Sequence, residues 1–267
     1  MLAENLRRDM DLLVPIRLRY PAAMIALLCV IIVAGLGAWF HQRSSPAGVD
    51  RFVAHWVHQL AGQHVGLMEQ VIRIGDPLSV AALVVGLALG TAALGRWRMV
   101  LLAVVGPTAA VLVTELLLKP MVGRTRYGQL AFPSGHTTGP AAVATVVLVL
   151  FLGGAWLTSP MVKAMLTLLG FGVSVAVSVA LVGRNWHYAT DTLGGICVAV
   201  ASVLVVALVI DKFGGGPCGP LERGGRGLSH AAAVRPVRGL VPAERHDLGQ
   251  HEIAREGRRD RCEPSRR

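Results

Sequence analysis

Residues 99–118 read MVLLAVVGPTAAVLVTELLL, an apolar run in which Glu115 is the one charged residue. As a helix rising about 1.5 Å per residue, such a run is long enough to cross a hydrocarbon core of about 30 Å. It continues without a gap into KPMVGRTR at 119–126, a segment with three cations. The stretch therefore predicts a membrane-spanning helix that ends in a cationic segment at the membrane surface.

Similar apolar runs occur on both sides of this one. They comprise residues 20–40, 77–95, 138–157, 162–182 and 192–210. Only 16% of the chain is charged, whereas soluble domains carry about 25% charged residues. We therefore predict an all-α fold, a polytopic helix bundle with six transmembrane helices and the lipid bilayer as its solvent.

The distribution of Lys and Arg predicts the orientation of this bundle. Cations precede the first run, separate the second from the third and the fourth from the fifth, and follow the sixth. Because cytoplasmic connections carry the excess of Lys and Arg, both termini are predicted to be cytoplasmic in a cell (inner or plasma) membrane. The connections 41–76, 119–137 and 183–191 then lie on the extracytoplasmic face. Apolar residues at helical spacing within 41–76 predict a helix along the membrane interface.

Three parts follow from this organisation: a cytoplasmic N-terminal segment at 1–19, a membrane domain at 20–211, and a tail at 212–267. The tail is rich in Gly, Pro and Arg, a composition that predicts a disordered, basic cytoplasmic segment. The net charge of +10 does not indicate nucleic acid, because the arginines concentrate in the termini and one short loop. The spacing of the four cysteines fits neither a disulfide framework nor a zinc site.

The segment Pro133-Ser134-Gly135-His136 directly precedes the fourth run. Serine is a preferred N-cap, and the free N–H groups of a helix start form a ready anion site. Ser134 and the Gly135 amide are therefore candidate phosphate ligands, and His136 is a candidate proton donor. The simpler alternative is an ordinary helix cap beside a chance histidine.

Lys119, Arg124 and Arg126 form a second polar segment. Gly123 lets the backbone turn so that these cations converge, and arginine presents a planar fork to phosphate oxygens. The alternative is a set of interfacial anchors whose side chains reach the lipid headgroups. Glu115 lies four residues before Lys119, so we predict an ion pair between them.

The third polar segment, 184–191, reads RNWHYATD. His187 and Asp191 are four apart, so they share one face of a helix. A carboxylate that accepts from one imidazole nitrogen leaves the other nitrogen free as a nucleophile or base. We find no third and fourth ligand for a metal site and predict none.

In this order and across this topology, the three segments resemble the type 2 phosphatidic acid phosphatase family, the membrane relatives of vanadium haloperoxidases. The resemblance covers about residues 77–211. Lys119 and Arg126 match the family's Lys, six residues, Arg-Pro motif, with Tyr127 in place of proline. The Pro-Ser-Gly-His motif is intact. In the third motif His187 and Asp191 match, but Ala180 and Leu181 occupy the Ser-Arg positions and the nearest arginine is Arg184.

The resemblance implies a phosphohistidine mechanism on a haloperoxidase-like core. His187 attacks phosphorus, Asp191 orients His187, and His136 protonates the leaving group. The implied phosphate ligands are Lys119, Arg126, Ser134, Gly135 and Arg184, with Arg124 as a further candidate. No metal or other cofactor is implied.

The predicted activity is a metal-independent phosphoric ester or diphosphate hydrolase that acts on a membrane lipid at the extracytoplasmic face. Phosphatidic acid, phosphatidylglycerol phosphate and polyprenyl pyrophosphate all fit as substrates, and the sequence sets no oligomeric state. The alternatives are a lipid-linked phosphotransferase on the same scaffold and a non-catalytic lipid-binding or transport protein. The latter predicts ionisable residues in mid-span, and these are few.

Overall fold

Membrane-length helices form the bundle in the computed structural model, which describes residues 12–153 and 159–213. Among the described residues, five stretches are long and apolar enough to cross a membrane. They are α2 (Ile16–Phe40), Trp97–Val122, α8 (Gly135–Gly153), α9 (Pro160–Gly183) and α10 (Ala189–Phe213). A sixth arises if α4 (Val65–Ile74) and α5 (Pro77–Ala93), which meet at a bend of 46°, form one broken span. The predicted all-α membrane bundle is confirmed.

The helix boundaries refine the predicted runs. α8 begins at Gly135, three residues before the predicted run, and α10 begins at Ala189 instead of residue 192. Both shifts place the polar segments directly on helix starts. Residues 154–158, which the prediction included partly in the fourth span, lie outside the described residues. So do residues 1–11 of the predicted N-terminal segment and residues 214–267 of the predicted tail.

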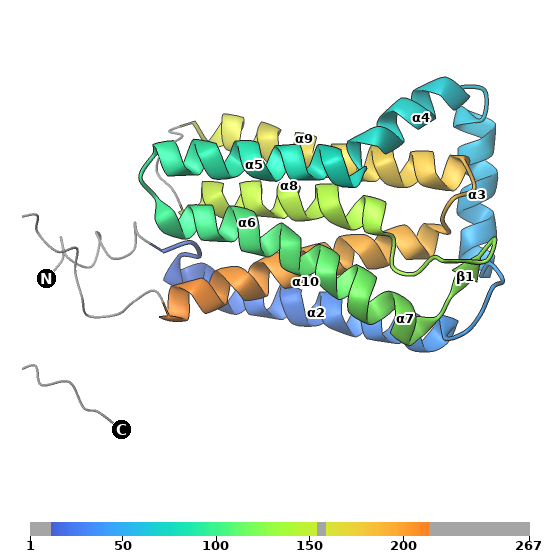
Figure 1. The fold of residues 1–267 in the computed structure, drawn as a ribbon, viewed down its shortest axis with the longest axis horizontal. Coiled ribbons are helices and arrows are strands. Elements are labelled where there is room, and N and C mark those ends of the chain that lie inside the picture. Colours follow the sequence, from blue (N-terminus) through green and yellow to red (C-terminus); the bar gives the residue numbers. More distant parts are fainter. Residues whose placement is uncertain (1–11, 154–158, 214–267) are drawn as a thin grey trace, which may run out of the picture. The chain divides into compact units, whose positions relative to one another are not determined.

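α8 and α10 form the centre of the bundle. α10 packs against α8, α2 and α6 (Trp97–Leu112), and α8 also packs against α9. Figure 1 shows these helices running side by side. The apolar window of α8 is 67% buried, whereas that of α2 is 22% buried. Small residues such as Gly106, Ala142 and Ala199 line the centre, and small side chains let membrane helices approach closely.

The third span changes its geometry as it approaches the polar end. α6 continues through a π-helical turn, η1 (Val113–Leu118), into the short helix α7 (Lys119–Val122). Gly123 then ends the helix with a left-handed backbone at φ 63°, which glycine adopts without a Cβ penalty. Such π-helical turns are frequent at functional sites, and this one contains Glu115, four residues before Lys119.

Residues 125–130 form a β-hairpin that the sequence did not predict. β1 (Thr125–Arg126) pairs antiparallel with β2 (Gln129–Leu130). Tyr127 and Gly128 both have positive φ angles, as a two-residue type I′ turn requires. The hairpin fixes the direction of Arg126.

Two helices follow α2 within the predicted outer connection. α3 (Gly48–Ala61) contains the helical apolar pattern seen in the sequence, and α4 continues from it to the bend. Both pack against α9, and α3 also contacts α10. Figure 1 shows α3 running across the end of the bundle where β1 lies.

At the opposite end of the bundle, an aspartate joins the last helix, α10, to the residues just before α2. Asp211, in the last turn of α10, accepts hydrogen bonds from the backbone N–H groups of Leu13 and Val14, each at 2.9 Å. Arg19 lies 3.8 Å from the same carboxylate. These contacts tie the beginning of α2 to the end of α10.

Candidate active site

The three polar segments meet at one end of the bundle. The backbone N–H of Ser134 donates to the carbonyl of Asp191 at 3.0 Å, which joins the start of α8 to the start of α10. Nη2 of Arg126 donates to Oδ1 of Asn185 at 3.0 Å, which joins the hairpin to the loop before α10. Segments separated by more than fifty residues in the sequence therefore surround one site.

The helix start at Gly135 is built for close approach by charged groups. A Cβ at this position would collide with the carboxylate of Glu115 and lie 3.8 Å from Nζ of Lys119. Ser134 is fully buried, and its carbonyl accepts from the N–H and the hydroxyl of Thr138. Lys119 forms the predicted ion pair with Glu115 at 2.8 Å. The ion pair of Glu115 and Lys119 thus lies beside the start of α8, whose free N–H groups favour an anion.

His187 and Asp191 form a buried pair. Nδ1 of His187 lies 3.7 Å from Oδ2 of Asp191, and the two side chains are 11% and 0% exposed. This distance exceeds that of a hydrogen bond, and Nδ1 has no hydrogen-bond partner in the structure. The carboxylate itself is held firmly, since its Oδ2 accepts from the backbone N–H of Tyr188 at 2.9 Å. Asp191 faces Nδ1, which leaves Nε2 of His187 available for chemistry.

His136 faces His187 from the first turn of α8. The ring centroids of the two histidines are 6.5 Å apart, and the ring of Trp186 lies edge-on at 6.2 Å from that of His136. Nε2 of His136 lies 3.5 Å from Oδ1 of Asp76, and these side chains are 33% and 44% exposed. Two imidazoles thus approach each other, one in a buried pair with a carboxylate and one in an open pair.

A small cavity adjoins His187. It has a volume of about 170 Å³, and its lining includes Arg51, Arg126 and Asn185. The guanidinium of Arg126 stacks on the ring of Tyr188, with Cζ 4.1 Å from the ring centroid. Stacking and the bond to Asn185 hold this cation beside the candidate nucleophile.

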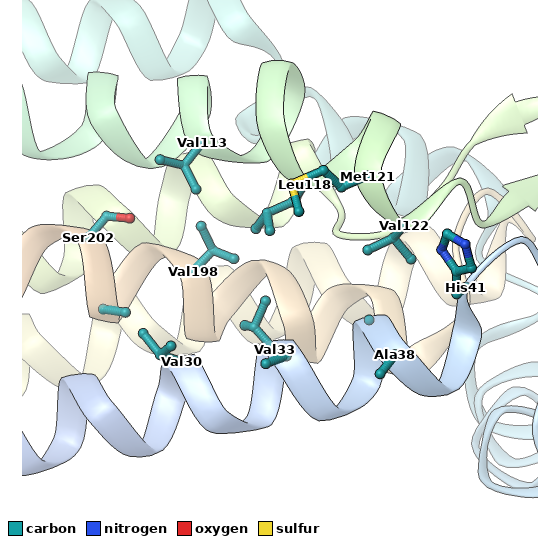
Figure 2. Close-up of a pocket in the computed structure, with 13 residues that line it drawn as sticks. Val30, Val33, Ala38, His41, Val113, Leu118, Met121, Val122, Val198 and Ser202 are labelled. Atoms are coloured by element: carbon teal, nitrogen blue, oxygen red, sulfur yellow. The ribbon is translucent and has the colours of Figure 1, made fainter.

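A larger apolar groove lies next to the site, between α2, α10 and the η1–α7 stretch (Figure 2). Its volume is about 440 Å³. Leu118 and Met121 line it, on either side of Lys119 in the sequence, and His41 lines its polar end. The remaining wall consists mainly of Val and Ala side chains of the membrane-spanning helices.

The sequence-family model of the PAP2 superfamily matches residues 22–214 of the chain. The chain belongs to the PAP2 superfamily. This membership identifies it as a phosphoric ester hydrolase and as a multi-pass membrane protein. The predicted family, fold and enzyme class are therefore confirmed.

A solved structure shares the fold of this PAP2 chain. It is the crystal structure of the first transmembrane PAP2 type phosphatidylglycerolphosphate phosphatase from Bacillus subtilis. The match has a TM-score of 0.54 and 19% sequence identity, and it covers 73% of this chain and 98% of that one. No curated protein matches the sequence.

Two arginines of the PAP2 site lie differently from the other predicted phosphate ligands. Nη2 of Arg184 pairs with Oε1 of Glu69 on α4 at 3.0 Å, and this pair is partly exposed. Arg124 is 0% exposed, and its terminal nitrogens contact the carboxylates of Asp50 and Asp191. The buried guanidinium of Arg124 therefore presents no surface to an anion, and its geometry suits positioning instead of phosphate contact.

Asp50, Asp76 and Glu69 are site residues that sequence reasoning missed. All three lie between α2 and α5 in the sequence, far from the motifs that they contact. Asp76 precedes Pro77 at the start of α5, a pattern typical of a helix N-terminus. That signal predicts a cap and gives no indication of a histidine partner.

Among the described residues, no group of three or more His, Cys, Asp and Glu side chains is arranged to hold a metal ion. The charged groups near the two histidines comprise the carboxylates of Asp191 and Asp76 together with the cations of Lys119 and Arg126. The site therefore offers side-chain cations to an anionic ligand.

Proposed function

We propose that this protein hydrolyses the phosphomonoester or pyrophosphate of a membrane lipid through a phosphohistidine intermediate. The observation that carries the proposal is the approach of His136 and His187 to 6.5 Å between ring centroids, with Lys119 and Arg126 beside them. Phosphoryl transfer depends mainly on positioning and charge stabilisation, and this arrangement supplies both.

In the first step, Nε2 of His187 forms a bond to phosphorus while the bond from phosphorus to the lipid oxygen breaks. His136 gives its proton to that departing oxygen, and Asp191 stabilises the positive charge that develops on the His187 ring. In the second step, water attacks phosphorus, the P–N bond breaks, and inorganic phosphate leaves. His136 accepts a proton from the attacking water and so returns to its starting state.

The phosphate oxygens in this mechanism contact Lys119, Arg126, Ser134, the Gly135 amide and Arg184. Ser134 and Gly135 supply the start of α8, whose free N–H groups stabilise negative charge. Lys119 supplies a point charge, and Arg126 supplies a planar fork. Because these groups are fixed before the substrate arrives, they need little reorganisation in the transition state. The proposal requires no metal.

The distribution of Lys and Arg supports an extracytoplasmic site with both chain ends in the cytoplasm. α3 and the hairpin β1–β2 both belong to connections that this rule assigns to the outer face, and both contribute to the site. A lipid phosphate in the outer leaflet reaches such a site while its tail stays in the bilayer.

The apolar groove supports a substrate with a hydrocarbon chain. Leu118 and Met121 belong to the groove, whereas Lys119 between them approaches the start of α8. A lipid with its phosphate at Lys119 therefore finds an apolar channel directly beside it. The groove fits an acyl chain as well as a prenyl chain, so the assay below must identify the lipid substrate.

The test measures inorganic phosphate released by the detergent-purified protein from phosphatidic acid, phosphatidylglycerol phosphate and a polyprenyl pyrophosphate. We expect release from at least one of them, inhibition by vanadate, and full activity in EDTA. The control variant is His55→Ala, since His55 lies exposed on α3. Loss of activity in EDTA would indicate a metal-dependent hydrolase. Transfer of the phosphoryl group to an acceptor without phosphate release would indicate the phosphotransferase.

A further inference from the structure

Arg124 forms the centre of a fully buried polar cluster behind the catalytic pair. Its Nη1 donates to Oδ1 of Asp191 at 2.6 Å and to the hydroxyl of Thr190 at 2.7 Å. Its Nη2 donates to Oδ2 of Asp50 at 2.9 Å. The guanidinium packs against two aromatic rings, with Cζ 3.6 Å from the centroid of Phe40 and 4.3 Å from that of Tyr188. These ring contacts and the hydrogen bonds at both terminal nitrogens restrict the orientation of the planar cation.

Asp50 contributes the second carboxylate from α3. Its Oδ1 accepts from the backbone N–H of Thr190 at 2.9 Å and from the Thr190 hydroxyl at 2.8 Å. Its Oδ2 accepts from the backbone N–H of Ala47 at 2.9 Å as well as from Arg124. Burial acts to raise the pKa of Asp50, but the hydrogen bonds from Thr190, Ala47 and Arg124 outweigh burial and hold the pKa below its usual value.

The sign of this shift fixes the charge of Asp50 during turnover. A carboxyl group with a lowered pKa contributes stability above its ordinary pKa, and this contribution disappears only as the pH falls through the lowered value. Asp50 is therefore ionised at neutral and mildly acidic pH. Two carboxylates and one guanidinium then leave the buried cluster with one net negative charge.

That remaining charge matters for His187. If Arg124 paired with Asp191 alone, the guanidinium would neutralise the carboxylate that faces Nδ1 of His187. Asp50 accepts a hydrogen bond from one terminal nitrogen of Arg124, and Asp191 accepts one from the other, so the cation is shared between two carboxylates. At the same time Arg124 holds Oδ1 of Asp191, which leaves Oδ2 directed toward His187.

We propose that Asp50 and Arg124 are positioning residues for His187, which act through Asp191. Arg124 fixes the orientation of the Asp191 carboxylate, and Asp50 preserves the negative charge that this carboxylate presents to the His187 ring. The proposal rests on the proposed function of His187 as the nucleophile. It extends the catalytic machinery to α3, a helix that contains none of the three motifs.

Other charged groups near His187 stay constant across the variants below. The imidazole of His136 lies across from it, and Arg126 and Arg51 line the adjoining cavity. Arg184 begins the same loop and pairs with Glu69. Because the variants leave these groups unchanged, a shift between variants reports the charge of the buried cluster.

The test compares three variants with the wild type. Asp50→Asn removes one negative charge, and Asp50→Asn combined with Arg124→Gln restores the net charge of the cluster. Asp211→Asn is the matched control, because Asp211 is also a buried carboxylate that accepts two backbone N–H groups and lies near an arginine. Each variant is characterised by thermal unfolding, by the pH dependence of kcat/KM for phosphate release, and by NMR titration of the labelled His187 ring.

We expect Asp50→Asn and Asp211→Asn to lower the unfolding temperature alike, since both remove a buried charged acceptor. Only Asp50→Asn should move the acidic limb of the pH profile and the midpoint of the His187 titration, downward by about 0.5–1 pH unit, because a negative charge near the imidazolium is lost. Its kcat should fall by about tenfold. The double variant should return the acidic limb toward the wild-type position even though its rate stays low.

An unchanged His187 midpoint in Asp50→Asn would overturn the proposal and leave the cluster with a purely structural role. So would equal shifts in Asp50→Asn and Asp211→Asn. If the double variant does not fold, the comparison of these two single variants still decides. The NMR titration needs no turnover, so it tests the cluster even if the wild type releases no phosphate, a result that would contradict the proposed function separately.

Discussion

The site contains two histidine–carboxylate pairs with opposite environments. In the first pair His187 and Asp191 are nearly inaccessible, and the carboxylate is fixed by Arg124 and by the N–H of Tyr188. In the second pair His136 and Asp76 are a third to nearly half exposed, and their closest atoms are 3.5 Å apart. The proposed nucleophile needs a fixed orientation, whereas the proposed general acid must also reach the attacking water. The difference in burial therefore supports the two proposed roles.

Removal of the ring of His187 should have the largest effect. We expect His187→Ala to lower phosphate release by at least about 1000-fold, about 4 kcal/mol of transition-state stabilisation, because it removes the proposed nucleophile. The unfolding temperature should stay close to that of the wild type. Near wild-type turnover in this variant would rule out the phosphohistidine route.

Removal of the ring of His136 should have a smaller effect that depends on the leaving group. General acid catalysis typically contributes about 100-fold or more, so His136→Ala should lower hydrolysis of an alkyl phosphate by that factor. An aryl phosphate with an acidic leaving group needs little protonation and should lose much less. Equal losses on both substrates would show that His136 does not protonate the leaving oxygen.

Substitution of Arg184 tests how the loop before α10 contributes to catalysis at the buried pair of His187 and Asp191. Arg184→Ala should lower the rate by about tenfold, about 1.4 kcal/mol, if this cation contacts phosphate in the transition state. The matched variant is Glu69→Gln, which removes the observed partner of Arg184 but keeps the cation. Similar losses in both variants would mean that Arg184 serves only to attach α4.

Asp76 should show the smallest effect, since its pair with His136 is open to solvent. Exposed ion pairs contribute about 0–1 kcal/mol and weaken with salt, so Asp76→Asn should lower the rate by about threefold at low ionic strength. The difference from the wild type should become smaller at high salt. A loss as large as that of His136→Ala would show that the open pair is as essential as the buried one.

The sequence predicted the parts of the molecule that local patterns determine. The apolar runs located the spans, and the fixed spacings around Lys119, Ser134 and His187 predicted the candidate site. The i,i+4 pair of Glu115 and Lys119 also followed from spacing alone. These features depend on residues that are close in the sequence, where helix geometry converts spacing into proximity.

Sequence reasoning missed the contacts that folding creates between distant segments. Asp50 meets Arg124 across 74 residues and Thr190 across 140 residues, and no local pattern indicates either contact. The hairpin was missed because its turn is Tyr-Gly instead of the Asn-Gly or Asp-Gly that marks a type I′ turn. Arg124 appeared equivalent to Arg126 in the sequence, but the hairpin keeps Arg126 beside the cavity and leaves Arg124 buried behind Asp191.

The contact of Asp211 with the N–H groups of Leu13 and Val14 has a consequence for biogenesis. Asp211 is separated from Leu13 by 198 positions and from Val14 by 197 positions. These hydrogen bonds therefore cannot form until the last helix has left the ribosome. Until then the first inserted helix lacks this anchor at its N-terminal end. Final assembly of the bundle is therefore a late, post-insertion event, and a nascent chain truncated before Asp211 should be more accessible to membrane proteases than one that includes it.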